Sequence, residues 1–354
     1  MNPSVVVWKR RWVTRRTSKG SVYRVWETPM PRIPDSIANC SIYLYKSEPA
    51  ARQGQDAGGS GFLVIIQSSA DPSRGYLYAI TNKHLIEDGF CVIRINLKSG
   101  DTDCVSAPSE DWIFHPDGDD VAVYPLDLQG DFNWVAISTD MFVDKECMQA
   151  YNIGYGDDVF LVGRLIAQSG RQKNTPVIRF GNISLTADSS EKIKYQNREQ
   201  EAFLIECRSI SGFSGSPVFV NGDRFYQGET AHEMHAFRKR KHPSFAANED
   251  PPPGGESNLN WGFKWPPLFV TVGPLLLGID FGHLPHWNDV YQKTRKTDYR
   301  AQSNTGIAGV VPAWKILELL ETPSLVDDRA MEDRKLKNKL LNEKPSNGIP
   351  TVKG

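Results

Sequence analysis

The chain has 354 residues, of which 40% are hydrophobic and 23% charged, and this composition excludes a collagen-like or wholly disordered protein. Its 41 Lys and Arg residues nearly balance 42 Asp and Glu residues, so overall charge gives no argument for nucleic-acid or membrane attraction. The length predicts about two domains. The 29 Gly and 23 Pro residues indicate many turns and short strands, and therefore a β-rich fold.

Cysteine usage and apolar runs bear on location. The cysteines are scattered without regular spacing, which favours reduced thiols (Cys40, Cys91, Cys104, Cys147 and Cys207). The first residues carry charges directly after a short apolar run, unlike a secretory signal. The most apolar stretch, residues 266–281, is short and interrupted by prolines. We therefore expect a cytoplasmic protein without membrane contact.

Residues 1–35 have the composition of a basic arm, in which lysines and arginines far outnumber the two acids. Runs of β-branched and aromatic residues on either side of a Ser-Lys-Gly turn predict a hairpin. Trp8, Trp12 and Trp26 lie among the basic residues and could stack on RNA or single-stranded DNA. We favour a hairpin that packs its tryptophans on the main body, which leaves nucleic-acid binding as the lesser alternative.

From residue 36 onward, short strand-like runs are separated by turn residues, with almost no long amphipathic helix between them. This pattern favours a sandwich or barrel over a parallel α/β sheet. One helix is predicted at residues 313–321, opened by Pro312. A long insertion at about 221–265 has the character of a functional loop or disorder. The charged residues at 322–354 predict a flexible tail.

Three short motifs contain residue types that cooperate in nucleophilic catalysis. Residues 79–84 (AITNKH) form an apolar strand that ends in His84. Asp120 stands directly before an apolar strand, within the sequence DDVAV. Ser214 lies in SGFSGSPV, residues 211–218, where glycines allow a tight turn before a further strand.

The chemistry explains why these residue types occur together. A serine hydroxyl is a poor nucleophile until a hydrogen-bonded imidazole takes its proton. The imidazole needs a buried carboxylate on its other nitrogen, which fixes its tautomer and stabilises the imidazolium. The glycines let the N–H groups of Gly212 and Ser214 point into one concavity, where they would stabilise an oxyanion. We expect no metal and no cofactor.

The order His, Asp, Ser and the sequence SGFSGSPV resemble the trypsin-like (chymotrypsin-fold) serine peptidases. The closest likeness is to their bacterial branch, which reads GxSGSPV and lacks disulfides. Residues 58–64 (GGSGFLV) look like that family's strand before the histidine. The resemblance implies that Ser214 is the nucleophile and His84 the general base and then acid. By the same resemblance, Asp120 orients His84.

The resemblance covers roughly residues 36–321 and implies an all-β fold with a C-terminal helix. Its two six-stranded antiparallel β-barrels would hold the site in the cleft between them. We expect an N-terminal barrel at residues 36–135, carrying the histidine and aspartate, and a C-terminal barrel at residues 136–321, carrying the serine. The implied activity is that of a cytosolic serine endopeptidase, which acts on a protein or peptide substrate through an acyl-enzyme.

The residue before the nucleophile departs from the secreted members of the family. Phe213 stands where those enzymes carry an aspartate that pairs with a freshly cleaved N-terminus, so activation by clipping is not expected. The oxyanion turn must then be held open by packing, or arranged by a partner or ligand. We therefore expect narrow substrate choice or activation through a regulatory protein partner.

The same resemblance indicates the substrate-binding residues. The residue six positions before the nucleophile forms the floor of the S1 pocket in the family, and here it is Arg208. A cation at that floor would favour Asp or Glu in the substrate. Asp280, on the strand that resembles the family's channel strand, could instead neutralise Arg208 and leave a polar pocket. Phe281 and His283 complete the predicted substrate-binding residues.

Other interpretations stay open. Asp119 could replace Asp120 as the carboxylate, although the acid directly before Val-Ala-Val matches the motif better. An α/β-hydrolase would need glycine in place of Ser216 and helices that the pattern lacks. Several histidines could form a metal site, although we expect the HEMH segment to be a solvated loop (His232, His235, His242, His283 and His286). The serious rival is a latent or inactive protease-fold interaction module.

Overall fold

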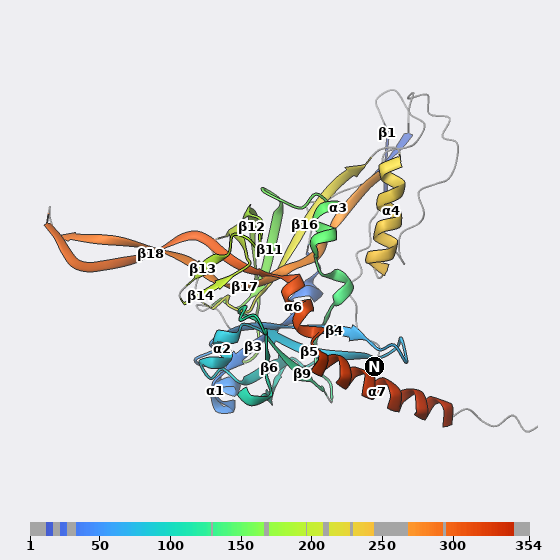
Figure 1. Ribbon diagram of the computed structural model, residues 1–354, viewed down its shortest axis with the longest axis horizontal. Coiled ribbons are helices and arrows are strands. Elements are labelled where there is room, and N and C mark those ends of the chain that lie inside the picture. Colours follow the sequence, from blue (N-terminus) through green and yellow to red (C-terminus); the bar gives the residue numbers. More distant parts are fainter. Residues whose placement is uncertain are drawn as a thin grey trace, which may run out of the picture.

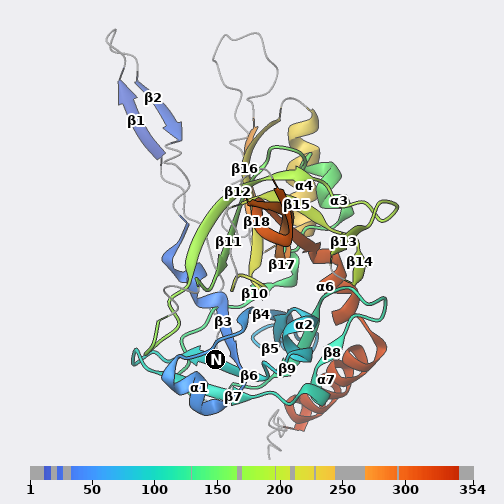
Figure 2. The same cartoon turned by 90° about the vertical axis from the view of Figure 1, so that its left-hand side faces the viewer.

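The computed structural model describes residues 12–16, 22–26, 33–128, 130–165, 170–195, 197–207, 212–226, 229–243, 268–292 and 295–342. The molecule consists mostly of antiparallel β-structure, arranged as two units that lie one above the other, with helices at its C-terminal end (Figure 1). A quarter turn of the view shows the same two units (Figure 2).

The N-terminal unit is an open, eight-stranded sheet rather than the closed six-stranded barrel that we expected. Its strands, in sheet order, are β7 (Thr102–Ser106), β6 (Val92–Asn96), β3 (Ser41–Tyr45), β4 (Gly59–Gln67), β5 (Gly75–Thr81), β9 (Ala122–Leu126) and β8 (Ile113–Phe114), and β10 (Ile137–Ser138) pairs with β4. β8 and β10 have only two residues each. Strands this short provide too few hydrogen bonds to close the sheet on itself.

Short helices connect the strands of this unit. They are α1 (Glu48–Gln53), α2 (Lys83–Glu87) and the 3-10 helices Asp35–Cys40, Ser109–Asp111 and Thr139–Met141. α1 begins where the Ser47 hydroxyl accepts the Ala50 N–H and ends at Gly54, whose φ of 65° is left-handed. α2 begins at Lys83, so His84 lies in the first turn of this helix. The sequence suggested instead that His84 ends a strand.

The C-terminal unit is a closed barrel of six antiparallel strands. In barrel order they are β11 (Asp158–Gly163), β12 (Val177–Leu185), β15 (Phe203–Glu206), β18 (Arg295–Pro312), β17 (Leu268–Gln292) and β16 (Pro217–Tyr226). A separate small hairpin, β13 (Ile193–Tyr195) and β14 (Arg198–Gln200), interrupts the path from β12 to β15. The apolar runs at residues 159–162 and 217–220 lie where the sequence placed strands.

Two strand pairs continue beyond the barrel. β17 and β18 stay paired out to Gln292 and Arg295, and they form a ribbon that projects to the left in Figure 1. β16 and β17 stay paired as far as Tyr226 and Leu268, so β16 extends into the predicted insertion at 221–265 and β17 begins just after it. Residues 227–228 and 244–265 of that insertion lie outside the described residues.

Helix α4 (Glu229–Lys241) occupies the first part of the insertion and packs against α3 (Lys145–Ala150). The ring of Phe237 contacts that of Tyr151 edge-on, with the centroids 5.3 Å apart, and the buried His242 stacks on the same tyrosine. We expected a solvated loop here. The prediction was wrong because the segment is helical and its Phe237 packs on Tyr151. Burial lowers the pKa of the nearby His242 and favours a neutral, packed imidazole.

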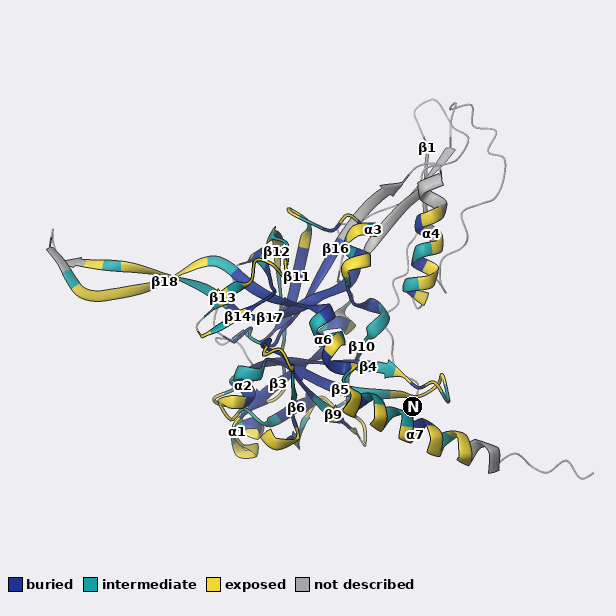
Figure 3. Cartoon of the chain, in the orientation of Figure 1, coloured by how far each residue is buried: buried dark blue, intermediate teal, exposed yellow. Residues whose placement is uncertain are grey.

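The buried apolar side chains form one core that the two units share, a further core inside the C-terminal unit, and a larger and a smaller core inside the N-terminal unit (Figure 3). The shared core joins Phe62 of β4, Phe160 of β11 and Leu276 of β17. Ile316 and Leu319 of α6 (Ala313–Leu320) fill it from the C-terminal side. The helix that the sequence predicted at 313–321 thus closes the interface between the units.

The N-terminal arm contains a described hairpin. β1 (Trp12–Arg16) pairs antiparallel with β2 (Val22–Trp26), with Trp12 opposite Trp26. Residues 1–11 and the side chains of the hairpin lie outside the described part, including the tryptophans proposed to pack on the body. Among the helices that the structure describes, none has the length and apolar character needed to cross a bilayer.

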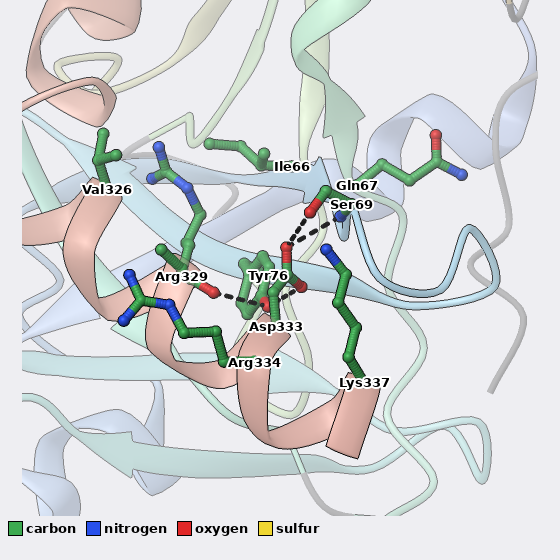
Figure 4. Close-up of a pocket in the computed structure, with 10 residues that line it drawn as sticks. Ile66, Gln67, Ser69, Tyr76, Val326, Arg329, Asp333, Arg334 and Lys337 are labelled. Atoms are coloured by element: carbon green, nitrogen blue, oxygen red, sulfur yellow. Dashed lines mark hydrogen bonds between the residues drawn. The ribbon is translucent and has the colours of Figure 1, made fainter. Parts of the chain in front are cut away.

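The predicted flexible tail is instead helical over its first part. α7 (Pro323–Asn342) is a 20-residue helix that lies along β4 and β5, and residues 343–354 lie outside the described part. Asp333 anchors it, because the Asp333 carboxylate accepts hydrogen bonds of 2.5 Å from each of the hydroxyls of Ser68, Ser69 and Tyr76 (Figure 4). The charged composition suggested a solvated tail. The sequence could not reveal these hydrogen-bond partners, because they are distant from Asp333 along the chain.

We expect Asp333→Ala to lower the free energy of unfolding by about 2 kcal/mol, because it removes a charged acceptor from three hydroxyl donors. Asp327→Ala, at an exposed position of the same helix, provides the control and should change stability by less than about 0.5 kcal/mol. Denaturant unfolding measures both values. Equal effects of the two substitutions would mean that Asp333 does not anchor α7.

Candidate active site

Sheet pairing brings His84 and Asp120 together. Thr81 at the end of β5 pairs with Ala122 at the start of β9, so the residues just beyond each strand meet at one edge. His84 Nδ1 lies 2.6 Å from Asp120 Oδ2, and the His84 backbone N–H donates to Asp120 Oδ1 over 2.9 Å. The carboxylate thus fixes both the ring and the backbone of the histidine.

Further groups hold Asp120, whose side chain is almost fully buried. The side-chain amide of Asn82 donates to the Asp120 carbonyl over 2.9 Å, and the Asp120 N–H donates to Gln200 Oε1 over 2.9 Å. Arg198 Nη1 lies 2.5 Å from Asp120 Oδ1. Burial opposes ionisation of Asp120, but the hydrogen bond and charge of His84, and then the charge of Arg198, outweigh it and lower the pKa of Asp120.

The turn that carries Ser214 leads into β16 and is bound to the N-terminal unit through Ser60 of β4. The Ser60 N–H donates to the Ser214 carbonyl over 2.8 Å, and the Ser60 hydroxyl donates to the Gly212 carbonyl over 3.3 Å. On the other side, the Gly215 N–H donates to the Asp280 carbonyl over 2.8 Å. The turn of Ser214 is therefore held between β4 of one unit and β17 of the other.

Two glycines permit this close approach. A Cβ at Gly215 would lie 1.8 Å from the Ser60 carbonyl oxygen, and the residue has a left-handed φ of +86°. A Cβ at Gly59 would lie 2.5 Å from Leu85 Cδ1 and 2.8 Å from the Ser214 carbonyl oxygen. Gly59 thus lies between α2, which carries His84, and the turn that carries Ser214.

Phe213 anchors the turn through packing. Its side chain is fully buried in the barrel core, and the guanidinium carbon of Arg179 lies 5.1 Å from the centre of its ring. The sequence raised the question of what holds the turn in place of a salt bridge at this position. In the structure, the burial of the Phe213 ring and its cation–π contact with Arg179 hold the turn in place.

The Ser214 hydroxyl points to the Phe281 carbonyl, with Oγ and O 3.5 Å apart. Among the described residues, it makes no hydrogen bond with His84. Within the same set, neither the Gly212 N–H nor the Ser214 N–H donates to another described group, while the Gly215 and Ser216 amides do. The two amides proposed for an oxyanion are therefore not used by the described turn itself.

The predicted substrate-binding residues have different outcomes. Arg208 lies outside the described residues. The Asp280 side chain is fully buried and accepts the Gly282 N–H over 2.8 Å, and the Phe281 ring is also buried, against Tyr195. Both side chains are therefore buried, and Phe281 belongs to the core that the two units share, while their contact with a substrate stays a prediction. His283 is half-buried and remains accessible.

The alternative carboxylate, Asp119, faces away from His84. Its Oδ2 lies 3.2 Å from Nδ1 of the buried His115 and 3.6 Å from Lys315 Nζ. His115, Asp117 and Glu318 have ligand atoms within 4.8 Å of one another, a spacing that could hold a metal ion. However, Lys315 Nζ lies 2.9 Å from Glu318 Oε2 and already supplies a cation there, so we interpret the group as an ion-pair network between α6 and the segment that joins β8 to β9.

Sequence reasoning missed Ser60, Tyr195, Arg198 and Gln200, which surround the three predicted residues. Arg198 and Gln200 come from the three-residue strand β14, and a strand so short carries no periodic pattern in the sequence. Ser60 lies in the GGSGFLV motif that was noticed, but only the fold shows that its hydroxyl and amide bind the nucleophile's turn.

No protein-family model matches the chain, and no curated protein matches it. Among solved structures, the MamO protease domain of Magnetospirillum magneticum is similar with a TM-score of 0.37, 14% identity, and coverage of 56% of this chain and 90% of that one.

The active form of the Rv3671c protease of M. tuberculosis is similar with a TM-score of 0.39, 12% identity, and coverage of 81% and 82%. The Tobacco Etch Virus protease, in a mutant form, is similar with a TM-score of 0.31, 12% identity, and coverage of 55% and 71%. At these TM-scores the overlays do not by themselves assign a fold family or an activity to the chain.

We expect Gly215→Ala to destabilise the protein by more than about 3 kcal/mol, because the new Cβ would clash with the Ser60 carbonyl in addition to straining the backbone. Gly89→Ala is the matched control, since Gly89 has nearly the same φ, +85°, with nothing within 4 Å of a Cβ. It should cost only about 1 kcal/mol. Similar losses in chemical denaturation would argue against the close approach at Gly215.

The lowered pKa of Asp120 predicts how stability depends on pH. A carboxyl group whose pKa is depressed by folding contributes stability above its unfolded pKa of about 3.9 and loses that contribution as the pH falls through the folded pKa. The stability difference between the wild type and Asp120→Asn should therefore be largest above about pH 5 and shrink toward pH 3. A difference that stays constant across this range in urea titrations would contradict the lowered pKa.

Proposed function

We propose that this chain is a serine endopeptidase that hydrolyses peptide bonds through Ser214, His84 and Asp120. The single observation that carries the proposal is the 2.6 Å contact between His84 Nδ1 and the buried Asp120 carboxylate, beside the turn of Ser214. A buried carboxylate on one imidazole nitrogen is the arrangement that prepares the other nitrogen to accept a proton. The family resemblance of the three motifs supports the same assignment.

In the proposed reaction, Ser214 Oγ attacks the carbonyl carbon of the scissile bond while His84 Nε2 takes the hydroxyl proton. Asp120 holds the tautomer of His84 and stabilises the imidazolium that forms. The N–H groups of Gly212 and Ser214 would stabilise the oxyanion of the tetrahedral intermediate. His84 then gives its proton to the leaving amine, and water hydrolyses the acyl-enzyme by the reverse sequence of proton transfers.

The serine must turn before it reacts, since its hydroxyl contacts the Phe281 carbonyl at 3.5 Å and not the imidazole. A rotation about χ1 moves Oγ between such positions, and catalytic hydrogen bonds are often long before substrate binds. Phe213 supports the turn from the barrel core during this change. The proposed enzyme thus has its acid–base pair assembled and its nucleophile close by.

Protein or peptide chains are the proposed substrates, and the cytoplasm is the proposed location. A peptidase in that compartment needs restraint, and we propose that a regulatory partner or a conformational change supplies it. The rival function is a latent or inactive protease-fold interaction module, which the arrangement of the Ser214 hydroxyl also permits. The two functions differ in whether Ser214 reacts with an electrophile.

A fluorophosphonate probe distinguishes the two functions, because it needs only an activated serine and an oxyanion site. We expect the purified full-length chain to be labelled, and we expect Ser214→Ala and His84→Ala to lose at least about 99% of the labelling rate. Ser216→Ala is the control, since the Ser216 hydroxyl lies in the same turn, is buried and has no hydrogen-bond partner among the described residues.

Labelling that Ser214→Ala abolishes and Ser216→Ala retains would establish a competent hydrolase. Its specificity could then be read from fluorogenic peptides that end in Glu, Arg or Leu. A folded protein that the probe does not label would overturn the enzyme proposal and favour the interaction module. Circular dichroism of each variant shows whether a loss of labelling comes from unfolding.

A further inference from the structure

Arg198 of the β13–β14 hairpin contacts the carboxylate that serves His84. Its Nη1 lies 2.5 Å from Asp120 Oδ1, and its Nη2 lies 2.5 Å from Glu87 Oε2 on α2. The hairpin lies next to α2 in both views of the chain (Figures 1 and 2). One guanidinium therefore joins the C-terminal unit to the helix that carries His84.

The Asp120 carboxylate is consequently shared between two cationic or potentially cationic groups. Oδ2 faces His84 Nδ1 at 2.6 Å, while Oδ1 takes both the His84 backbone N–H and the Arg198 guanidinium. The Asp120 side chain is only 3% exposed, so solvent screens these charges weakly. A guanidinium keeps its charge at every pH at which proteins stay folded.

This sharing has a chemical consequence for the proposed mechanism. The carboxylate assists the serine's attack because its negative charge stabilises the imidazolium that forms on His84. A permanent cation on the same carboxylate offsets that charge and lowers the stabilisation.

We propose that Arg198 is a restraining residue of the triad, which the β13–β14 hairpin places on Asp120 and so limits the basicity of His84. The proposal rests on the serine-peptidase function proposed above and gives that site a means of regulation. Release of Arg198 from Asp120 would return the full charge of the carboxylate to His84.

The hairpin is built so that a ligand can displace it. Its strands have three residues each and pair only with one another, and an isolated two-stranded hairpin is marginally stable in water. Arg198 and Gln200 bind it to Asp120, and the Tyr195 ring packs on Phe281 with the centroids 5.2 Å apart. These contacts, made to the site itself, hold it in place.

Tyr195 also brings the hairpin close to the nucleophile. A Cβ built at Gly282 would lie 3.0 Å from the Tyr195 hydroxyl and 3.8 Å from Ser214 Oγ. A peptide that approaches Ser214 along β17 therefore meets Tyr195, three residues before Arg198 in the same hairpin. A ligand that binds better when the hairpin is shifted would favour the released state in proportion to that difference in affinity.

The other charged groups near Arg198 and Asp120 have ion-pair partners of their own. On α2, Glu87 takes Arg198 and also lies 3.6 Å from Lys83 Nζ. Asp119, next to Asp120 in the chain, faces His115 and Lys315. Among the described arginines and lysines, Arg198 is the one with an ion pair to Asp120. Its removal should therefore change the charge at His84 more than the removal of any other described lysine or arginine.

The test is the pH dependence of fluorophosphonate labelling in Arg198→Gln. The rate falls at low pH because a protonated His84 cannot accept the serine's proton. Without Arg198 the imidazolium is better stabilised, so the midpoint of this acid limb should move up by about one pH unit. Above the limb, the stronger base should raise the labelling rate about threefold.

Three further variants make the test specific. Lys194→Gln removes an exposed cation from the same hairpin and should leave both the midpoint and the rate unchanged. Arg198→Lys keeps the charge and should stay closer to the wild type than Arg198→Gln. Glu87→Gln removes an anion from beside Arg198, and its midpoint should move down. A rate that falls in Arg198→Gln with an unmoved midpoint would overturn the proposal and leave Arg198 a structural residue.

A second measurement does not depend on hydrolase activity. In a Ser214→Ala background, the pH midpoint of the His84 ring resonances in NMR should rise by the same amount when Arg198→Gln is added. A rise without labelling of any variant would uphold the restraint by Arg198 and overturn the peptidase function. Labelling of the wild type without any rise would uphold the peptidase and overturn the restraint.

Discussion

Ser60 provides the contacts on which the candidate site depends. Its N–H and hydroxyl bind the carbonyls of Ser214 and Gly212 in the turn of the C-terminal unit. Its hydroxyl also accepts the Arg164 N–H over 2.9 Å, and its own carbonyl accepts the Thr81 hydroxyl over 2.8 Å. Because Thr81 ends the strand that leads to His84, Ser60 connects β5, the turn of Ser214 and the barrel.

That connection determines which residues the neighbouring positions can hold. The turn and β4 approach so closely that a side chain at residue 215 would occupy the space of the Ser60 carbonyl. On the other face, Phe213 is held in the barrel core, so the turn cannot move away without exposing an aromatic ring. The glycine-rich sequence around Ser214 therefore follows from the contact between the units as well as from the chemistry of an oxyanion site.

Local patterns predicted what local physics determines. Apolar runs between turn residues located the main strands, and Pro312 with its following apolar periodicity located α6. The His84–Asp120 contact was implied by the family resemblance of their two motifs, and the structure contains it. The sequence-based prediction failed where contacts with residues distant in the chain determine the structure. α7 has a charged composition, yet its Asp333 finds hydroxyl partners more than 250 residues away, and the short β14 carries Arg198 without any periodic signal.

The Arg198 contact sets stability and reactivity against each other in the proposed enzyme. The guanidinium neutralises a buried carboxylate and joins the hairpin to α2. Both effects favour the arrangement in which the hairpin contacts Asp120. The same charge weakens the base that the carboxylate supports. A restraint of this kind needs no cleaved propeptide and no aspartate in place of Phe213, since it acts on the acid–base pair and not on the oxyanion turn. Whatever shifts the hairpin must replace the contacts of Arg198 with contacts of its own, and a bound peptide can supply them.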